Sequence, residues 1–422
     1  MNIIKKKICI IGIGYIGLPT AAMFAAHGYE VVGVDVNPNV VSELNKGKIV
    51  IEEPHLDKMV FDAVNSGNLT AKTQPEEADA FIISVPTPIN KDKTADMRYV
   101  TAAAESIVPY LKEGNIVVLE STSPPRTVED LILPILKKSG LKIGEQVFVA
   151  HSPERVLPGR ILIELVENDR IVGGINKASS EAVRDLYKTF VKGEIFLTDA
   201  TTAEMCKLME NTFRDVNIAL ANELAMLCES MGINAWDVIK LSNKHPRVNL
   251  HQPGPGVGGH CIAVDPWFII EKNPEVSKII HLSRITNDNM PKYVYEKSKK
   301  ILSDIAGNKK VTIFGATYKP NVDDMRESPI LELAELFEND PKTEVKLTDP
   351  HIKSHPLLEK NLIEAARGSS LVILGVNHAE FSNIDFAKLK SVMAAPNIFD
   401  TRNFWNKEEL LTLGFNYYLL GS

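Results

Sequence analysis

Cysteine, glycine and a carboxylate occur together in the run GPGVGGHCIAVDPW at residues 254–267. Glycine lacks a Cβ atom, so backbone or ligand atoms can approach such a turn closely. Free cysteines are commonly buried as small apolar residues, but a glycine-rich turn is a poor place to bury one. The pattern therefore favours Cys261 as a displayed nucleophile, with the carboxylate of Asp265 four residues further on.

A second glycine pattern, GIGYIG at residues 12–17, follows an apolar run at residues 7–11. The spacing predicts a strand, a tight turn and a helix from Leu18 to about His27, with a pyrophosphate held at the amino end of the helix. A further apolar run ends at Asp35, whose carboxylate suits the ribose hydroxyls. The pattern predicts a dinucleotide site, and Asp35 favours NAD over NADP.

Length and composition are those of a globular enzyme. The chain has 422 residues, of which 44% are hydrophobic and 24% charged, and its formal net charge is -7. This length suggests two or three domains, and the charge gives no reason to bind nucleic acid or an anionic membrane. We expect a cytoplasmic protein without a signal peptide or membrane span, in which Lys5–Lys7 form a solvated entrance to the first strand.

The four cysteines are scattered, with no CxxC pair and no metal-ligand spacing to histidine. We therefore predict reduced thiols and no metal site. Cys9, Cys206 and Cys228 are expected in the core, Cys206 because it points about 100° away from Lys207 on a helix.

Apolar runs predict strands at residues 78–85, 115–121, 146–150 and 170–175, alternating with helices in a parallel α/β pattern. Ligands in such sheets lie beyond the carboxyl ends of the strands. Thr87 and Thr122 follow two of these ends, and they are either neighbours of the cofactor or ordinary turn residues.

A long segment without a helix breaker, residues 203–231, predicts one helix that is apolar nearly all round and buried between domains or subunits. Lys207, Asn211 and Arg214 share one face of it. This stripe suits a polar anionic ligand, and the alternative is a salt-bridged interface with Glu204 or Glu210.

A smaller α/β domain is predicted from about residue 309, with strands at residues 310–315, 344–349, 370–376 and 397–400. The connector at residues 316–329 contains Lys319 and Arg326, which could bind phosphate groups or form surface salt bridges with Asp323 and Asp324.

These pieces together resemble the UDP-glucose/GDP-mannose dehydrogenase family over essentially the whole chain. The resemblance is carried by Gly12–Gly17, the STSP after Glu120, the SPER at residues 152–155, residues 204–214, the cysteine run and the RESP at residues 326–329. It implies an α/β fold of two Rossmann-like doubly wound domains joined by a long central helix and a helical middle domain. The expected boundaries are an NAD-binding domain at residues 1–200, a central dimerisation domain at residues 201–305 and a UDP-sugar-binding domain at residues 306–422.

The resemblance implies a four-electron oxidation of a nucleotide sugar at its sixth carbon by two NAD. Lys207 would be the general acid and base, Cys261 the nucleophile that forms a thiohemiacetal and a thioester, and Asn211 a donor to the oxyanion. Glu154 and Asp265 are alternatives for orienting the hydrolytic water or positioning Lys207, and either carboxylate could be structural. The product would serve polysaccharide biosynthesis.

The same resemblance implies two sets of binding residues. Around NAD lie Gly12, Gly14, Tyr15, Ile16, Gly17, Asp35, Thr87, Thr122 and Arg326. Around the UDP-sugar lie Arg155, Val156, Lys207, Asn211, Arg214, His245, Arg247, Gly258, Tyr318, Lys319 and Arg402. Active sites of the family commonly draw on a partner subunit across the central helix, so at least a homodimer is expected.

Within the family, HPRVN at residues 245–249 and the His260–Cys261 pair resemble the branch that oxidises UDP-N-acetyl-D-mannosamine. Members that oxidise UDP-N-acetylglucosamine share the His–Cys pair and are the alternative, whereas UDP-glucose enzymes typically carry Ser and Phe beside the cysteine. Two other classes stay open, a two-electron hydroxy-acid dehydrogenase, which would not use Cys261, and a noncatalytic nucleotide-sugar sensor.

Overall fold

A computed structural model describes residues 6–307 and 309–422, so the start of the basic run, up to Lys5, lies outside the described residues. The described chain divides into two compact units. Unit 1 extends to Glu210 and also contains Trp267–Asn273, and unit 2 contains Asn211–Pro266 and Pro274–Ser422.

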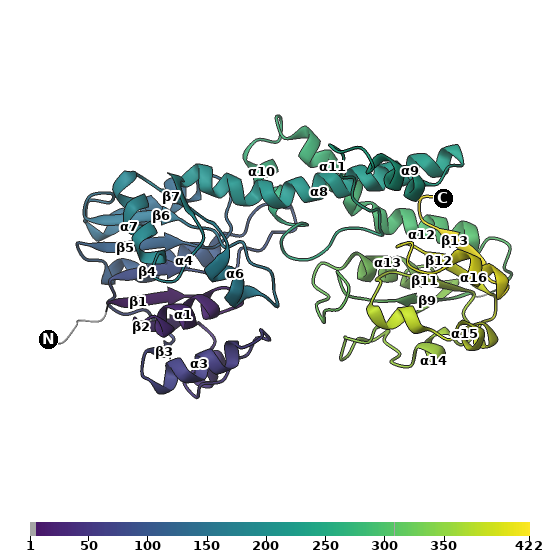
Figure 1. The fold of residues 1–422 in the computed structure, drawn as a ribbon, viewed down its shortest axis with the longest axis horizontal. Helices are drawn as coiled ribbons and strands as arrows, with labels where there is room; N and C mark the ends of the chain where they lie inside the picture. The colour runs from purple at the N-terminus through teal and green to yellow at the C-terminus, as the bar shows by residue number, and fades with distance from the viewer. Residues whose placement is uncertain (1–5, 308) are drawn as a thin grey trace. The chain divides into compact units, whose positions relative to one another are not determined.

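Unit 1 is built on an eight-stranded sheet with the order β3-β2-β1-β4-β5-β6-β7-β8 (Figure 1). Its strands are β1 Lys7–Ile11, β2 Glu30–Val34, β3 Leu69–Lys72, β4 Ala80–Ile83, β5 Asn115–Leu119, β6 Val147–His151, β7 Arg170–Gly174 and β8 Ile195–Asp199. The predicted parallel pattern holds except between β6 and β7, which pair antiparallel through their last residues, Ala150 with Gly174 and His151 with Gly173.

Side chains of the central strands point alternately to two apolar layers, as the period of two in a strand requires. Ile8 and Ile10 face the layer that contains helices α1, α3, α6 and α7, and Cys9 and Ile11 face the layer that contains α4 and α5. The helices of unit 1 are α1 Gly17–Ala26, α2 Pro38–Leu44, α3 Leu56–Asn65, α4 Arg98–Ile107, α5 Leu133–Leu136, α6 Ile161–Glu167 and α7 Lys177–Tyr187, with a π-helical turn at Val128–Ile132 before α5.

The predicted long helix is α8, Ala200–Met231. It begins three residues earlier than predicted, because the carboxylate of Asp199 accepts the N–H and the hydroxyl of Thr202 and so caps its first turn. Helix α10, Asp265–Lys272, also belongs to both units. Within unit 1, Oε2 of Glu271 on α10 accepts the N–H of Ala95 at 2.7 Å.

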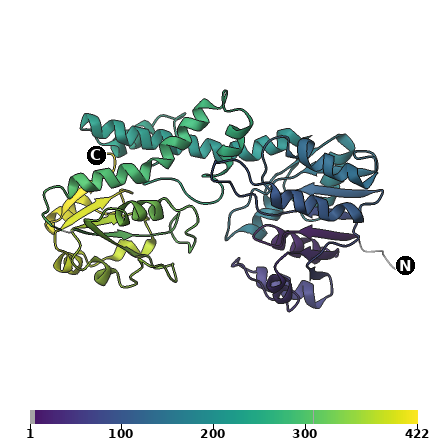
Figure 2. The ribbon, with the colours of Figure 1, turned by 180° about the vertical axis from the view of Figure 1, so that it is seen from behind.

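Unit 2 contains a parallel five-stranded sheet, drawn in green and yellow in Figure 2. Its strand order is β10-β9-β11-β12-β13. The strands are β9 Lys309–Phe314, β10 Thr343–Thr348, β11 Leu371–Leu374, β12 Asn397–Asp400 and β13 Asn416–Leu419, of which β13 was not predicted. The helices are α9 Ala235–Ser242, α11 Lys278–Asp288, α12 Met290–Ile301, α13 Pro329–Glu338, α14 Leu362–Ala366, α15 Phe386–Val392 and α16 Lys407–Thr412.

Both sheets reverse their strand order beside the first strand, at β1 in unit 1 and at β9 in unit 2. The carboxyl ends of strands at such a reversal form the ligand crevice of doubly wound sheets. The two predicted doubly wound domains and the long central helix are therefore confirmed.

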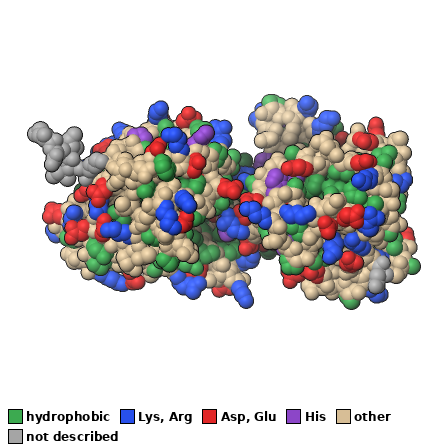
Figure 3. All heavy atoms as spheres, turned by 90° about the horizontal axis from the view of Figure 1, so that it is seen from below, with side chains coloured by type: hydrophobic (Ala, Val, Ile, Leu, Met, Phe, Trp, Pro, Cys, Tyr) green, Lys and Arg blue, Asp and Glu red, His purple; other side chains and the backbone are tan. Residues whose placement is uncertain are grey.

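The surface charges and the hydropathy of the helices say little more about what the protein binds. Acidic and basic side chains are interspersed over the face of each unit drawn in Figure 3. Among residues 6–307 and 309–422, no helix is both long and apolar enough to cross a bilayer.

Candidate active site

The predicted nucleophile lies on an exposed turn of unit 2. The carbonyl oxygen of Cys261 accepts the N–H groups of Val264, at 3.1 Å, and Asp265, at 2.9 Å. Cys261 and Asp265 therefore occupy the two ends of one helical turn. The thiol is exposed, which confirms that this cysteine is displayed rather than buried.

Asn211 connects this turn to helix α8. Its Nδ2 donates to Oδ2 of Asp265 at 2.6 Å, and Asp265 is almost fully buried. Lys207 precedes Asn211 by one turn on the same helix. In unit 1, burial and, to a smaller extent, the charge of Lys207 together lower the pKa of His151 to about 3, so this imidazole is neutral. Both ring nitrogens of His151 lack a hydrogen-bond partner within the described part of the chain.

The glycines before Cys261 are needed because the connector at residues 318–329 packs directly on them. A Cβ atom on Gly258 would overlap the carbonyl oxygen of Glu327, and one on Gly259 would lie 2.7 Å from the ring of Tyr318. The N–H of Gly259 also donates to the carbonyl oxygen of Arg326. Glu327 has a φ of 51°, a strained value for a residue with a side chain. Two predicted substrate residues, Gly258 and Tyr318, are thus brought together beside the cysteine.

Arg402 contacts Gly254, the first residue of the run that contains Cys261. A Cβ atom on Gly254 would overlap its guanidinium, and its Nε donates to the carbonyl oxygen of Gly375 at 3.1 Å. Burial lowers the pKa of Arg402 to about 10, yet the group is still cationic at neutral pH. It is therefore a suitable partner for an anionic ligand at the carboxyl ends of β11 and β12.

A chain of buried hydrogen bonds holds the backbone of Gly254. Its N–H donates to Oδ1 of Asn222 at 2.9 Å, Nδ2 of Asn222 donates to Oδ1 of Asn287 at 2.9 Å, and Nδ2 of Asn287 donates to Asp215 at 2.8 Å. Asp215 also forms a fully buried ion pair with Arg284, and burial raises its pKa to about 6. The sequence reasoning missed this chain, although Asp215 and Asn222 are polar residues seven apart on a mostly apolar helix.

The glycines of residues 12–17 have different roles. Gly12 has a φ of 92°, and a Cβ atom there would lie 2.5 Å from the carbonyl oxygen of Ser84. A Cβ atom on Gly17 would overlap the carbonyl oxygen of Gly12. Gly14 is different, because a Cβ atom there would meet no heavy atom within 4 Å among the described residues. Gly14 therefore leaves an open cradle at the amino end of α1, which fits a pyrophosphate of NAD.

The other predicted NAD contacts of unit 1 follow the carboxyl ends of β1, β2, β4 and β5. Asp35 follows β2 and accepts the N–H of Asn37 at 2.9 Å. Ser121 Oγ donates to the carbonyl oxygen of Val85 at 2.7 Å, which ties the loop that carries Thr122 to the loop that carries Thr87. Both threonines are partly buried, whereas Tyr15 is exposed and Ile16 is partly buried.

Several predicted charges have partners within the protein. Arg326, predicted for NAD, lies in unit 2 and pairs with Asp324 at 2.7 Å, as the salt-bridge alternative expects, and its contact with NAD stays a prediction. Lys319 instead lies over the ring of Tyr318 at 5.5 Å. Arg155 pairs with Glu210 at 2.8 Å, beside the partly buried Val156.

Glu154 is held in a buried ion pair with Arg170. The guanidinium of Arg170 also lies 3.9 Å from the ring centre of Tyr187, whose hydroxyl donates to Glu120 at 2.5 Å. Burial raises the pKa of Glu120 and that of Tyr187. This arrangement supports the structural alternative for Glu154, and its role toward water stays a prediction.

The face of α8 that carries the predicted polar residues is not fully covered within the single chain. Arg214 is exposed, and Lys207 and Asn211 are partly buried, so burial of this face at a subunit interface stays a prediction. Glu204 and Glu210 have other partners and do not form the alternative salt-bridged stripe. The expectation that Cys206 lies in the core was wrong, because this residue is partly exposed, whereas Cys9 and Cys228 are buried as predicted. His245 and Arg247 are both exposed on the loop after α9.

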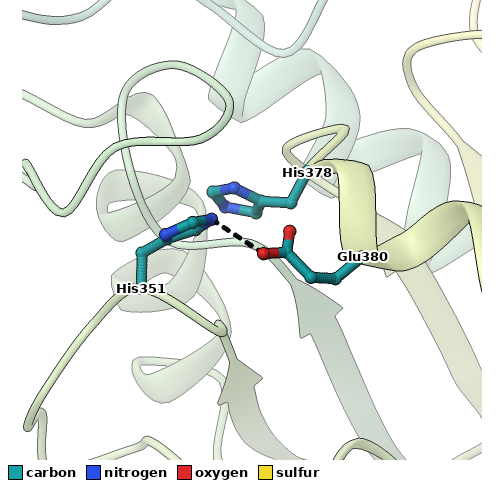
Figure 4. Close-up of side chains that lie close together, drawn as sticks. All are labelled: His351, His378 and Glu380. Atoms are coloured by element: carbon teal, nitrogen blue, oxygen red, sulfur yellow. Dashed lines mark ion pairs between the residues drawn. The ribbon is translucent and has the colours of Figure 1, made fainter. Parts of the chain in front are cut away.

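One cluster in unit 2 resembles a metal site but is poorly suited to one. The ligand atoms of His351, His378 and Glu380 lie within 4.8 Å of one another, and His351 pairs with Glu380 at 3.4 Å (Figure 4). Nδ1 of His378 accepts the N–H of Asn321 at 3.0 Å, so its Nε2 carries the proton and lies 3.0 Å from Asp349. His378 therefore has no nitrogen left for a metal ion.

Comparison with known proteins places the chain in a family. It matches three consecutive domains of the UDP-glucose/GDP-mannose dehydrogenase family, namely the NAD binding domain over residues 6–191, the central domain over residues 201–289 and the UDP binding domain over residues 312–407. The chain belongs to this family. It is an NAD-dependent dehydrogenase, and its UDP binding domain indicates a UDP-sugar substrate.

Similar proteins extend over nearly the full length. A Methanococcus maripaludis protein named UDP-N-acetyl-D-mannosamine dehydrogenase is 50% identical over 99% of this chain and 97% of its own length. The structure of the UDP-N-acetyl-mannosamine dehydrogenase of S. aureus has a TM-score of 0.89 and 48% identity, over 98% of each chain. A Ralstonia solanacearum protein named NDP-N-acetyl-D-galactosaminuronic acid dehydrogenase is 46% identical over 96% of this chain and 97% of its own length.

Proposed function

We propose that this protein oxidises UDP-N-acetyl-D-mannosamine at the sixth carbon to UDP-N-acetyl-D-mannosaminuronate, with two NAD reduced per sugar. The observation that carries the proposal is the turn from Cys261 to Asp265, which exposes the thiol and is hydrogen-bonded to Asn211, one helical turn from Lys207. The full-length similarity to proteins named as UDP-N-acetyl-D-mannosamine dehydrogenases supports the choice of sugar.

NAD, when bound, supplies the hydride acceptor for each of the two oxidations. In the proposed sequence, Lys207 takes the proton of the sugar hydroxyl as the alcohol becomes an aldehyde. Sγ of Cys261 then bonds to the aldehyde carbon, and the oxygen takes up a proton to give a thiohemiacetal. Loss of a hydride and of that proton gives a thioester. Water breaks its C–S bond, releasing the uronate and the thiol.

Asn211 and Asp265 support these steps by hydrogen bonding. An amide has two N–H donors, and Asn211 uses one for Asp265. The second is available to the oxyanion of the thiohemiacetal. The bond to Asp265 holds the amide plane in a fixed orientation, so this donor is positioned before the substrate arrives.

The test is to count NADH formed per sugar consumed, with UDP-N-acetyl-D-mannosamine, UDP-N-acetylglucosamine, UDP-N-acetylgalactosamine and UDP-glucose supplied separately. We expect two NADH for the mannosamine compound. Cys261→Ser abolishes this turnover, and Cys206→Ser, the same change at a partly exposed cysteine, leaves it intact. Turnover of another sugar alone would overturn the proposed substrate. One NADH per sugar would overturn the thioester route and favour a two-electron dehydrogenase, and NADH binding without turnover would favour a sensor.

We further propose that the protein acts as a homodimer in the cytoplasm. In unit 2, helix α8 exposes Phe213, Leu220 and Leu227 at intervals of seven residues. Helix α11 exposes Ile279 and Leu282. An apolar stripe with this repeat suits a second helix of the same kind, and a second copy of α8 supplies one by two-fold symmetry.

A further inference from the structure

A carboxylate close to Lys207 on α8 accepts hydrogen bonds from two backbone N–H groups far away in the sequence. Glu204 precedes Lys207 by three residues and is fully buried. Its Oε2 accepts the N–H of Arg126 at 2.6 Å, and its Oε1 accepts the N–H of Val128 at 2.8 Å. Both donors belong to the segment at residues 121–128, here called the β5 loop, which also carries Thr122. One side chain thus joins the β5 loop to the helix of Lys207.

The two accepted N–H groups come from backbone that needs an external partner. Arg126 has a φ of 72°, which is costly for a residue with a side chain. Val128 opens the π-helical turn Val128–Ile132, and N–H groups at the start of a helix have no partner within it. A carboxylate suits this end of a helix electrostatically. Glu204 therefore stabilises a loop conformation that the local sequence would not hold alone.

The charges around Glu204 come from three elements of unit 1. Glu129 follows the β5 loop, Lys272 lies on α10, and the Arg126 side chain turns outward to pair with Glu129. Burial, with a smaller contribution from Glu129, raises the pKa of Glu204 to about 7, although the two backbone N–H groups and Lys272 oppose the rise. The carboxylate is therefore mostly ionised at pH 8 and mostly protonated at pH 6.

We propose that Glu204 is a positioning residue that fixes the β5 loop relative to the turn of α8 carrying Lys207, so that cofactor binding depends on its ionised carboxylate. The proposal rests on the cofactor and catalytic roles proposed for Thr122 and Lys207. An ionised carboxylate accepts through both oxygens, whereas a protonated one has a hydroxyl in place of one acceptor. Protonation thus weakens one of the two bonds and loosens the hold on either Arg126 or Val128.

The chain offers a matched control. Glu53 is also buried, and its two oxygens accept the N–H groups of Gly159, at 2.7 Å, and Ile161, at 2.8 Å. Glu53→Gln therefore removes the same kind of double acceptor from the same unit without touching the β5 loop or α8. Any effect common to both variants reports the loss of a buried carboxylate rather than the positioning role.

The experiment is NADH binding without sugar, followed by fluorescence at pH 8 and pH 6, for wild type, Glu204→Gln and Glu53→Gln. We expect Glu204→Gln to weaken NADH binding about 10-fold at pH 8, because an amide NH₂ faces a backbone N–H donor. Wild type and Glu53→Gln should weaken between pH 8 and pH 6, and Glu204→Gln should change much less. A folded Glu204→Gln with wild-type affinity at both pH values overturns the proposal.

A second measurement does not depend on the variant folding. Hydrogen exchange of wild type, corrected for the intrinsic pH dependence, should show lower protection at pH 6 than at pH 8 for residues 121–130. Residues 157–165, held by Glu53, should show no such difference. Equal protection of residues 121–130 at both pH values would overturn the proposal. Because neither readout requires turnover, a failure to oxidise the sugar would count against the proposed substrate and leave this inference standing.

Discussion

At the scale of single residues, the three glycines of the cofactor motif do different work. Gly12 and Gly17 are required by the protein itself, because Cβ atoms there would approach Ser84 and Gly12 too closely. Only Gly14 leaves space that no described protein atom occupies. The motif therefore combines two residues that permit the fold with one that leaves room for a ligand.

This difference predicts opposite behaviour for two alanine variants. Gly14→Ala should keep the stability of wild type to about 0.5 kcal/mol, as for an exposed substitution, and should weaken NADH binding about 10-fold by crowding the pyrophosphate. Gly17→Ala should lower the free energy of unfolding by about 1–3 kcal/mol through overpacking. Chemical denaturation and NADH titration separate the two. Equal loss of stability in both variants would contradict these assignments.

The exposure of the cysteine could be predicted from the sequence better than the ion-pair partners of the arginines. Cys261 was predicted to be displayed from its glycine neighbours alone, and it is exposed. Arg155 and Arg326 instead pair with Glu210 and Asp324. A long cation in a charged region has several partners within reach, and its choice depends on rotamers and on packing that the local sequence does not specify.

At the scale of elements, a series of hydrogen bonds between α8 and α11 holds Gly254, where the cysteine run begins. Asn222 on α8 donates to Asn287 on α11 and accepts the N–H of Gly254. These groups are buried, so each needs its partner. The cysteine loop is thereby held on one side by these hydrogen bonds, and on the other by the contact of Gly254 with Arg402.

Asn222→Ala should therefore affect both stability and turnover. We expect a loss of about 1–3 kcal/mol in the free energy of unfolding, because the Gly254 N–H and Asn287 lose a buried partner. We also expect a lower kcat with little change in NADH affinity, because the loop bears the thiol. Asn217→Ala is the control, since this partly buried side chain on the same helix donates only to the carbonyl oxygen of Phe213 in the described contacts. Unchanged kcat in a destabilised Asn222→Ala would contradict the link to the loop.

The principal elements could be predicted from apolar periodicity, and the exceptions have physical reasons. Predicted strands became β4, β5, β9 and β12 with small shifts at their ends. The edge strands β3, β8 and β13 were missed, because exposed positions leave them without a continuous apolar run. The antiparallel pairing of β6 with β7 was also missed, since strand direction depends on how the long connection through α6 returns to the sheet.

At the scale of the whole molecule, the proposed dimer predicts a molecular mass in solution that sedimentation can measure. Leu220→Glu places a charge in the middle of the apolar stripe of α8, and burying an unpaired charge is costly. We expect wild type to sediment as a dimer at micromolar concentration and Leu220→Glu as a monomer. Leu411→Glu, at a similarly exposed leucine on α16, should sediment like wild type. A monomeric wild type would contradict the proposed homodimer.

Most of α10 belongs to unit 1 although it follows the first segment of unit 2 in the sequence, and this order limits how genes for such proteins can recombine. Residues up to Glu210 are only part of the cofactor-binding unit, because Glu271, which accepts the N–H of Ala95, is encoded after the cysteine run. A gene fusion that moved the first 210 codons alone would leave that carboxylate behind. Recombination between relatives is therefore constrained to exchange the nucleotide-binding half together with the segment that supplies the thiol.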